Sequence, residues 1–265
     1  MPEQRPDILQ SAVAALPAVT LEEMDSVKLM NRIDTKYLTD EATLVKVLAD
    51  AKAAGYRALE AEDARISPYN SVYYDTDGLK MYLDHHNRRL VRQKVRTRVY
   101  VNSGDAFLEI KRKNNHGRTK KKRTSIPLSE MEGFASDEKA CAYLAKHSAF
   151  TAQMLTPAMS TAFRRITLVN AALTERLTID TGVNFSNYRT GKKASLENAV
   201  IIELKQDGHA SSTMKKILLD HRVKPVRVSK YCIGEALTDP QLKSGRFKVK
   251  VRTIEKIMDK TIQVI

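Results

Sequence analysis

Several residue types and motifs that mark common protein classes are scarce in this sequence. There is no tryptophan, and aromatic residues make up only 6% of the 265 positions. Proteins that bind single-stranded nucleic acid stack bases on aromatic side chains, so we do not expect nucleic acid as the partner. Only Cys141 and Cys232 occur, with no CxxC spacing and no histidine at ligand spacing. The sequence therefore predicts a reducing compartment, with neither a disulfide framework nor a zinc site.

Long apolar segments and glycine-rich phosphate loops are also missing. No apolar run approaches the roughly 20 residues that span a bilayer, and the N-terminus lacks a signal-peptide pattern. We therefore expect a cytoplasmic protein, with any contact at the inner face of a membrane made through a partner chain. Neither a P-loop sequence nor a GxGxxG motif is present. Bound phosphate would then be held by side chains that project from strands.

Positive charge dominates what is present. The formal net charge is +14 and the pI is about 9.7, which implies an anionic partner: nucleic acid, a membrane surface or a phosphorylated small molecule. With 42% hydrophobic and 29% charged residues, the composition is that of a globular protein. We predict a single domain over residues 1–265, with a loosely packed tail at 1–19 and a C-terminal segment at 242–265 that carries a packing helix.

The stretch 90–113 reads as two strands joined by a turn at Asn102–Asp105. Successive side chains of a strand point to opposite faces. One face of this hairpin would therefore carry Arg92, Lys94, Arg96 and Arg98, followed by Glu109, Lys111 and Lys113. A polar face in water is the ordinary interpretation of such a pattern. Because stacked like charges repel, we favour a wall that faces a polyanion.

The remaining chain predicts more strands with helices between them. Strands are expected at 27–38, 69–76, 158–170, 176–188 and 198–207, and the basic run Lys120–Arg123 continues the hairpin as a third strand; helices are expected at 39–55, 136–150 and 211–221. We predict an α+β fold, in which an antiparallel, eight-stranded tunnel barrel is closed and flanked by helices. Such a barrel has room for side chains and one slender ligand. Lined with arginine and lysine, it would suit a polyphosphate chain.

Nine short motifs carry a resemblance to a known family. In order they are RIDTKYL, NSVYYDT, VRTRVY, FLEIKRK, KKKR, FRRI, RLTIDT, AVIIELK and VSKY. Together they resemble the VTC (vacuolar transporter chaperone) domain, the polyphosphate polymerase branch of the triphosphate tunnel metalloenzymes. The similarity runs from about Lys28 to Gly234, nearly the whole chain. It implies the same tunnel barrel that the strand pattern predicts.

The resemblance also implies a set of site residues. It gives catalytic roles to Lys230, Arg96, Arg98 and Lys111, substrate binding to Lys36, Lys121, Arg165, Arg176, Arg227 and Ser229, and a Mn²⁺ or Mg²⁺ ligand to Glu203. The register within the KKKR run is open, and Lys121 is its best match. Three positions depart from the family pattern: Phe163 replaces a frequent Tyr, Arg227 a usual Lys, and Asp34 a Glu. The first removes one hydrogen bond to substrate, and the other two preserve charge.

The implied reaction transfers the terminal phosphoryl group of ATP to inorganic polyphosphate and releases ADP. Two alternatives stay open: a metal-dependent tripolyphosphatase or nucleoside triphosphatase of the same fold, and a non-catalytic module that binds polyphosphate or an RNA end. Hydrolases of this fold use more glutamates, so the few carboxylates Asp34, Glu109 and Glu203 among many cations favour the polymerase. Eukaryotic family members carry membrane spans. The resemblance therefore also implies a membrane-protein partner chain.

Overall fold

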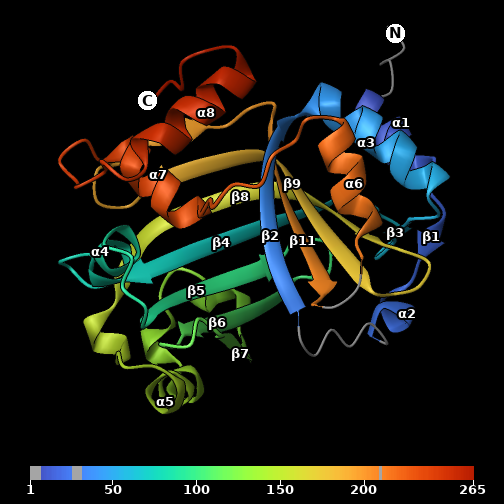
Figure 1. Cartoon of the computed structure of the whole chain (residues 1–265). Coiled ribbons are helices and arrows are strands. Elements are labelled where there is room, and N and C mark those ends of the chain that lie inside the picture. Colours follow the sequence, from blue (N-terminus) through green and yellow to red (C-terminus); the bar gives the residue numbers. More distant parts are fainter. Residues whose placement is uncertain (1–6, 26–31, 209–210) are drawn as a thin grey trace, which may run out of the picture.

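The computed structural model describes residues 7–25, 32–208 and 211–265, and one strongly curved sheet organises it (Figure 1). The principal strands are β2 (Arg32–Asp40), β4 (Ser67–Asp75), β5 (Arg92–Tyr100), β6 (Asp105–Lys113), β7 (Thr119–Ile126), β8 (Thr156–Val169), β9 (Glu175–Asn187) and β11 (Ala199–Asp207). They pair antiparallel in the order β2-β11-β9-β8-β4-β5-β6-β7. Three short strands lie beside this path: β1 (Ala18–Val19), β3 (Arg57–Leu59) and β10 (Lys193–Ser195).

The predicted strands are confirmed wherever the structure describes them. The hairpin of β5 and β6 places Arg96 opposite Glu109 and Lys94 opposite Lys111. β7 then places Lys121 opposite Lys111, which settles the register of the basic run. The strand expected at 27–38 begins at Arg32 in the described part of the chain, and residues 27–31 lie outside it.

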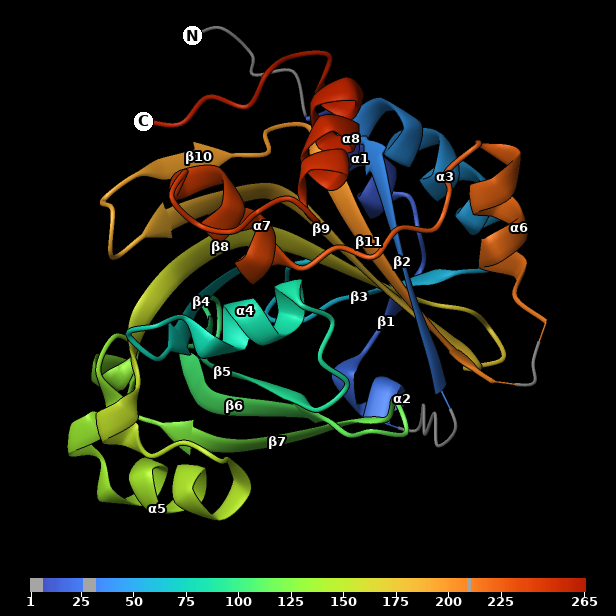
Figure 2. The same cartoon turned by 60° about the vertical axis from the view of Figure 1, so that its left-hand side comes forward.

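The sheet curls without closing into a barrel. Figure 2 shows its two halves, β2, β11, β9 and β8 on one side and β4 to β7 on the other, curving around a common interior. Its end strands β2 and β7 share no ladder in the described residues. The predicted number of strands is confirmed, whereas the predicted closure is wrong. β7 carries the exposed run Lys120–Arg123, and an edge strand rich in lysine resists further pairing.

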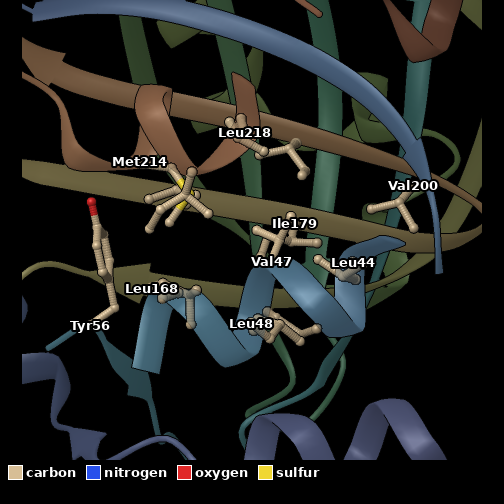
Figure 3. Close-up of a cluster of buried hydrophobic side chains, with 14 of the residues drawn as sticks. Leu44, Val47, Leu48, Tyr56, Leu168, Ile179, Val200, Met214 and Leu218 are labelled. Atoms are coloured by element: carbon tan, nitrogen blue, oxygen red, sulfur yellow. The ribbon is translucent and has the colours of Figure 1, made fainter. Parts of the chain in front are cut away.

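Three helices cover the outer face of β8, β9 and β11: α1 (Ile8–Ala14), α3 (Glu41–Ala53) and α6 (Thr213–Asp220). Figure 3 shows Leu44, Val47 and Leu48 of α3 packed with Ile179 and Val200 of the sheet. The predicted α3 is confirmed, and its N-terminus is capped by Asp40, whose side chain accepts a hydrogen bond from Thr43 N at 2.7 Å. This apolar layer holds one half of the sheet in shape.

The other half of the sheet is covered by α5 (Glu138–His147) and three short 3₁₀ helices at Leu128–Glu130, Phe134–Ser136 and Ala152–Met154. Phe134 and Leu144 pack there against Val95 and Leu108. The helix expected at 136–150 is present but begins at Glu138, because the carboxylate of Asp137 caps it by accepting a hydrogen bond from Ala140 N at 3.1 Å.

One end of the sheet is covered by α4 (Lys80–His86), α7 (Lys230–Thr238) and α8 (Lys248–Met258). A side chain at Gly234 would place its Cβ 2.7 Å from Phe185 Cδ1 and 3.0 Å from Met159 Sδ. Glycine therefore allows α7 to approach β8 and β9 closely. The helix expected within 242–265 is α8, whose Ile254 and Met258 are buried.

The N-terminal segment is better packed than the sequence predicts. Leu9, Val13 and Leu16 are each 2% exposed or less and join the core beneath α3. The expectation of a loose tail at 1–19 is therefore wrong for its described part. Three prolines suggested an irregular segment, but Leu9 and Val13, one helical turn apart, anchor α1.

A short helix, α2 (Leu21–Asp25), follows β1. A capping box stabilises its N-terminus: Thr20 N donates to Glu23 Oε2 at 2.9 Å, and Glu23 N donates to Thr20 Oγ1 at 3.2 Å. Among the described helices, none is both long enough and apolar enough to cross a membrane. Both Cys141 and Cys232 are free thiols.

Candidate functional site: a cation-lined sheet face

The concave side of the sheet, here called the inner face, is formed by alternate residues of its strands. Its members include Tyr69, Ser71, Tyr73, Lys94, Arg96, Arg98, Glu109, Lys111 and Lys121 in one half, and Asp34, Lys36, Phe163, Arg165, Arg176, Thr178, Asp180, Glu203 and Lys205 in the other. Charged side chains of the two halves interact electrostatically. Lys111 of β6 lies in the field of Glu203 and Lys36 from β11 and β2. The curl of the sheet therefore concentrates these charges around one interior.

Glu109 bridges two cations in the first half. Its Oε2 accepts hydrogen bonds from Nε and Nη2 of Arg96 at 2.8 and 2.5 Å, and its Oε1 is ion-paired with Lys121 Nζ. Burial would raise the pKa of Glu109, but Arg96, Arg98 and Lys121 lower it well below its ordinary range. Glu109 is 0% exposed, and it is a buried, ionised carboxylate.

Asp180 plays the same part in the second half. It receives both Nε and Nη2 of Arg165, at 2.6 and 2.8 Å, in a forked pair, and it is also ion-paired with Lys230 Nζ. Burial would raise the pKa of Asp180, but Arg165 and Lys230 together lower it. Since Lys230 is the first residue of α7, this carboxylate ties the helix to β8 and β9.

Glu203 lies between a third pair of cations but is held more loosely. Lys36 Nζ and Lys205 Nζ are each 3.8 Å from its carboxylate oxygens. Burial would raise the pKa of Glu203, but Lys36, Lys205 and Lys111 lower it well below its ordinary range. Lys36 Nζ also donates to the Val228 carbonyl at 3.2 Å, next to the start of α7. Glu203 is therefore ionised without a direct hydrogen bond to either lysine.

Three further cations, Lys94, Arg98 and Lys111, have no carboxylate within 4 Å in the described ranges. Burial, with the charges of Arg96 and Arg165, lowers the pKa of Arg98 to about 10. The charge of Arg96, with burial, lowers the pKa of Lys111 well below its ordinary value. Together with the six bridged cations they make nine, here called the central cations, against three carboxylates. This surplus repels itself unless an anion is bound.

The rings of Tyr69 and Phe163 support three of the central cations. The rings of Tyr69 and Phe163 stack with centroids 5.6 Å apart. The guanidinium carbons of Arg98 and Arg165 lie 5.1 to 5.5 Å from these rings, and Lys230 Nζ lies 4.4 Å from the Phe163 centroid. Phe163 therefore acts through cation–π contacts, and it brings Lys230 close to both arginines.

Ser229 is the N-cap of α7. Its Oγ accepts from Cys232 N at 3.4 Å and from Lys94 Nζ at 2.7 Å. The segment before it is irregular rather than a strand. The Lys94 contact connects β5 of the first half with α7, which Lys230 connects to the second half.

The structure gathers most of the predicted site residues on the inner face. Those that lie together are Lys36, Arg96, Arg98, Lys111, Lys121, Arg165, Glu203, Ser229 and Lys230. Arg176 lies beside Lys205 in the ladder of β9 and β11. Arg227 lies apart from this group, in the exposed segment before α7. It is close to Arg92 and Lys113. Burial is the main cause that lowers the pKa values of these two residues, and the charge of Arg227 lowers them further.

Among the inner-face residues that received no site role from the sequence, Lys94, Lys205, Tyr73 and Asp180 lie next to residues that did receive one. Asp180 was the most informative of these, since it holds both Arg165 and Lys230. Its signal was available in the motif RLTIDT, where strand alternation places Arg176, Thr178 and Asp180 on one face. Lys94 belongs to the basic face of the hairpin, but the hairpin pattern alone gives it no specific role.

Glu203 is the residue of the inner face that fits a divalent metal ion. In the described part of the chain, no three His, Cys, Asp or Glu side chains gather as a ligand cluster. Glu109 and Asp180 are occupied by close cations, whereas Glu203 is ionised and contacts its lysines only at 3.8 Å. Mg²⁺ commonly binds through one or two carboxylates and completes its shell with phosphate oxygens and water. A metal site here would therefore need the substrate's oxygens.

Comparison with known protein families agrees with this geometry. The family model of the VTC domain matches residues 31–238. The chain belongs to the VTC domain family. No individual curated protein matches it by sequence. Membership places this VTC domain among the triphosphate tunnel proteins, which generally use divalent metals.

Solved structures support the fold of this VTC domain. A candidate adenylate cyclase from Bacillus halodurans aligns with a TM-score of 0.51 at 14% identity, covering 76% of this chain and 96% of the other. A candidate adenylyl cyclase from Hippeastrum, described as having a dominant triphosphatase activity, aligns with a TM-score of 0.47 at 12% identity, covering 77% and 95%. The first of these likenesses shows that the domain has the tunnel fold.

Proposed function

We propose that this VTC domain is a metal-dependent polyphosphate polymerase that uses ATP as the phosphoryl donor. The observation that carries the proposal is the imbalance of the inner face: nine central cations surround three carboxylates, each of which already bridges two of them. One nucleotide triphosphate with its metal ion would leave much of this charge unpaired. A face that holds a donor triphosphate and an acceptor chain together would balance it.

The proposed transfer needs little covalent help from the protein. A terminal oxygen of the polyphosphate chain forms a bond to the γ-phosphorus of ATP, the bond from that phosphorus to the β–γ bridging oxygen breaks, and ADP leaves with the electron pair. Arg96, Arg98, Lys111 and Lys230 would align the two phosphates and balance the charge on the transferring group. Arginine supplies forked donors and lysine a mobile point charge.

The remaining assigned residues would hold the two substrates on either side of the transfer. Lys36, Lys121, Arg165, Arg176 and Ser229 are proposed to bind phosphates of the nucleotide or the chain, with Arg227 contacting phosphates outside the central group. Glu203 would hold Mn²⁺ or Mg²⁺, which when bound neutralises charge on the phosphate oxygens.

Two features weigh against the alternative activities. Hydrolysis requires a water molecule to be activated, and both Glu109 and Asp180 are engaged with cations at hydrogen-bonding distance. RNA-end binding would use exposed rings for base stacking, whereas Phe163 and Tyr73 are 3% and 7% exposed. These observations favour phosphoryl transfer to a polyphosphate chain.

We place this activity in the cytoplasm, with any coupling to a membrane made through a membrane-protein partner chain. The free thiols of Cys141 and Cys232 are compatible with a reducing compartment.

The test is incubation of the purified protein with ATP and Mn²⁺, followed by a polyphosphate gel and by separate assays of ADP and phosphate. A ladder of polymer with matching ADP is the expected result. Phosphate release without polymer would instead identify a hydrolase, and binding without turnover a binding module. Lys121→Ala should lower the rate, while Lys120→Ala, which alters the adjacent lysine on the opposite face of β7, should leave it unchanged.

A further inference from the structure

Tyr73 occupies a fixed position on the inner face. It pairs with Arg96 across β4 and β5, and it is only 7% exposed. Its ring stacks on Tyr231 of α7, with centroids 5.2 Å apart and planes 20° apart. Tyr231 is itself held by a hydrogen bond to Asp75 at 2.6 Å. The phenol is therefore held in one place by the sheet and by the helix that carries Lys230.

The hydrogen bonding of this phenol is incomplete. Its oxygen accepts from Arg96 Nη1 at 3.0 Å, but no group in the described residues accepts its own proton. Four other buried tyrosines donate theirs to a carboxylate or a carbonyl: Tyr56 to Glu175, Tyr74 to Met131, Tyr82 to Lys243 and Tyr231 to Asp75. Buried donors are rarely left unused, so the proton of Tyr73 is available to a ligand.

The surroundings of the phenol are strongly cationic. The groups that face it or lie next to it are Lys94, Arg96 and Arg98 of β5, Lys230 and Tyr231 of α7, Glu109 of β6 on the far side of Arg96, and Asp75 of its own strand behind Tyr231. Burial would raise the pKa of Tyr73, but Arg96, Arg98, Lys230 and Lys94 lower it to about 8. An acceptor for this proton would therefore be an anion that these four cations also attract.

We propose that Tyr73 contacts the substrate directly, by donating its phenol hydrogen bond to a phosphate oxygen bound among Lys94, Arg96, Arg98 and Lys230. This inference rests on the proposed function and adds to it a neutral donor within a cationic site. In the complex, the phenol oxygen accepts from Arg96 while its proton points to the phosphate. Tyr73 thus becomes a binding residue for phosphate chains as well as a part of the wall.

The experiment uses tripolyphosphate as the probe and compares the wild type with Tyr73→Phe and Tyr74→Phe. Tyr73→Phe keeps the ring stacked on Tyr231 and removes only the hydroxyl, and it should weaken tripolyphosphate binding at pH 7 by about tenfold to a hundredfold, as for a hydrogen bond to a charged group. Tyr74 is the matched control, because it neighbours Tyr73 but donates to the Met131 carbonyl. Its variant should bind tripolyphosphate like the wild type.

Tyrosinate absorbance supplies a readout that a merely structural role would not move. One tyrosine of the free wild type should ionise near pH 8, Tyr73→Phe should lack this transition, and tripolyphosphate should shift it to higher pH because the phenol must keep its proton to donate. Equal affinity of Tyr73→Phe and wild type, or a transition that tripolyphosphate does not move, would overturn the role of Tyr73 and leave the phosphate site standing. Absence of tripolyphosphate binding to the wild type would overturn both.

Discussion

At the scale of single residues, the three bridging carboxylates of the inner face divide into two kinds. Glu109 and Asp180 are almost fully buried and make direct hydrogen bonds to arginine. Glu203 keeps 23% of its side chain exposed and has only long ion pairs. We infer that the first two hold the cations in place and that Glu203 is left for the metal.

Replacement of these carboxylates by glutamine should separate the two roles. Glu109→Gln leaves Arg96 and Lys121 without their shared charge, and breaking such a buried pair costs roughly 3–5 kcal/mol of unfolding free energy. Glu203→Gln should change thermal stability far less but abolish turnover at limiting Mn²⁺. Thermal denaturation and initial rates measure both. If Glu203→Gln retains turnover, Glu109 or Asp34 becomes the better candidate for the ligand.

Lys230 is expected to act in the transition state more than in ATP binding. It stands at the N-terminus of α7, where backbone N–H groups favour an anion and disfavour a cation. Lys230→Ala should lower turnover by roughly 10²-fold, the scale of removing one preorganised donor, with a smaller effect on ATP affinity. Lys230→Arg should recover only part of the loss, because a planar fork differs from a compact ammonium. Lys224→Ala, in the exposed preceding loop, is the control, and a rate for Lys230→Ala within about twofold of wild type would remove this lysine from the site.

At the scale of elements, α7 connects the two halves of the inner face. Ser229 receives Lys94 from β5, Lys230 is paired with Asp180 of β9, and Tyr231 donates to Asp75 at the end of β4. Asp75 also accepts from the first backbone N–H groups of α4. A small displacement of α7 would therefore move several phosphate-facing groups together.

Gly234 makes this position of α7 possible, and Gly234→Ala should disturb it. The added Cβ would meet Phe185 and Met159 at 2.7 and 3.0 Å, and overpacking of this kind typically costs about 1–3 kcal/mol. We expect a lower melting temperature together with lower turnover, because Ser229 and Lys230 move with the helix. Gly245→Ala adds a methyl group where no atom lies within 4 Å, and it should alter neither. An unchanged melting temperature for Gly234→Ala would show that the contact relaxes freely.

The elements with strict alternation could be predicted from the sequence, and those that depend on distant partners could not. The β5–β6 hairpin followed from its period of two and its turn, so the inner-face positions of Arg96, Arg98 and Lys111 followed as well. The prediction that the sheet closes into a barrel was wrong, because closure depends on how far the sheet twists between β2 and β7. Strand alternation in RLTIDT indicates the face on which Asp180 lies, but nothing local shows that its carboxylate meets Arg165 and Lys230 across the fold. α1 was missed because its stabilising contacts lie on α3.

At the scale of the whole molecule, the excess of cations should make stability depend on pH. The pKa of Lys121 is lowered by burial from 10.5 to about 8 in the folded protein, and that of Tyr73 is lowered from 10.0 to about 8. Between about pH 8 and about pH 10 the unfolded chain therefore binds more protons than the folded one, so the free energy of unfolding rises with pH. Above about pH 10 the trend reverses, because burial raises the pKa of Tyr56 and of Tyr82.

We therefore expect the melting temperature of the free protein to rise from about pH 8 to about pH 10. Bound tripolyphosphate should raise the melting temperature most near neutral pH, because it favours the protonated cations, and it should flatten or invert this rise. On the acid side, the lowered pKa values of Glu109, Asp180 and Glu203 give stability that is lost as the pH falls below their ordinary values of 4.5, 3.8 and 4.5. Thermal denaturation across this pH range, with and without tripolyphosphate, tests whether the melting temperature rises or falls in each part of it.

The bridging carboxylates also determine how strongly salt would compete with the ligand. A polyanion in solution carries condensed counter-ions. When a protein neutralises some of its charges, the corresponding counter-ions are released into the solvent, and for this reason the affinity falls as salt is added. Glu109, Asp180 and Glu203 are counter-ions that belong to the chain itself, so nine central cations present a net of only six charges. The logarithm of affinity should then fall with the logarithm of salt at a slope of about −4, where nine uncompensated cations would give about −6. A domain built in this way keeps more of its affinity for phosphate chains in the ionic medium of a cell.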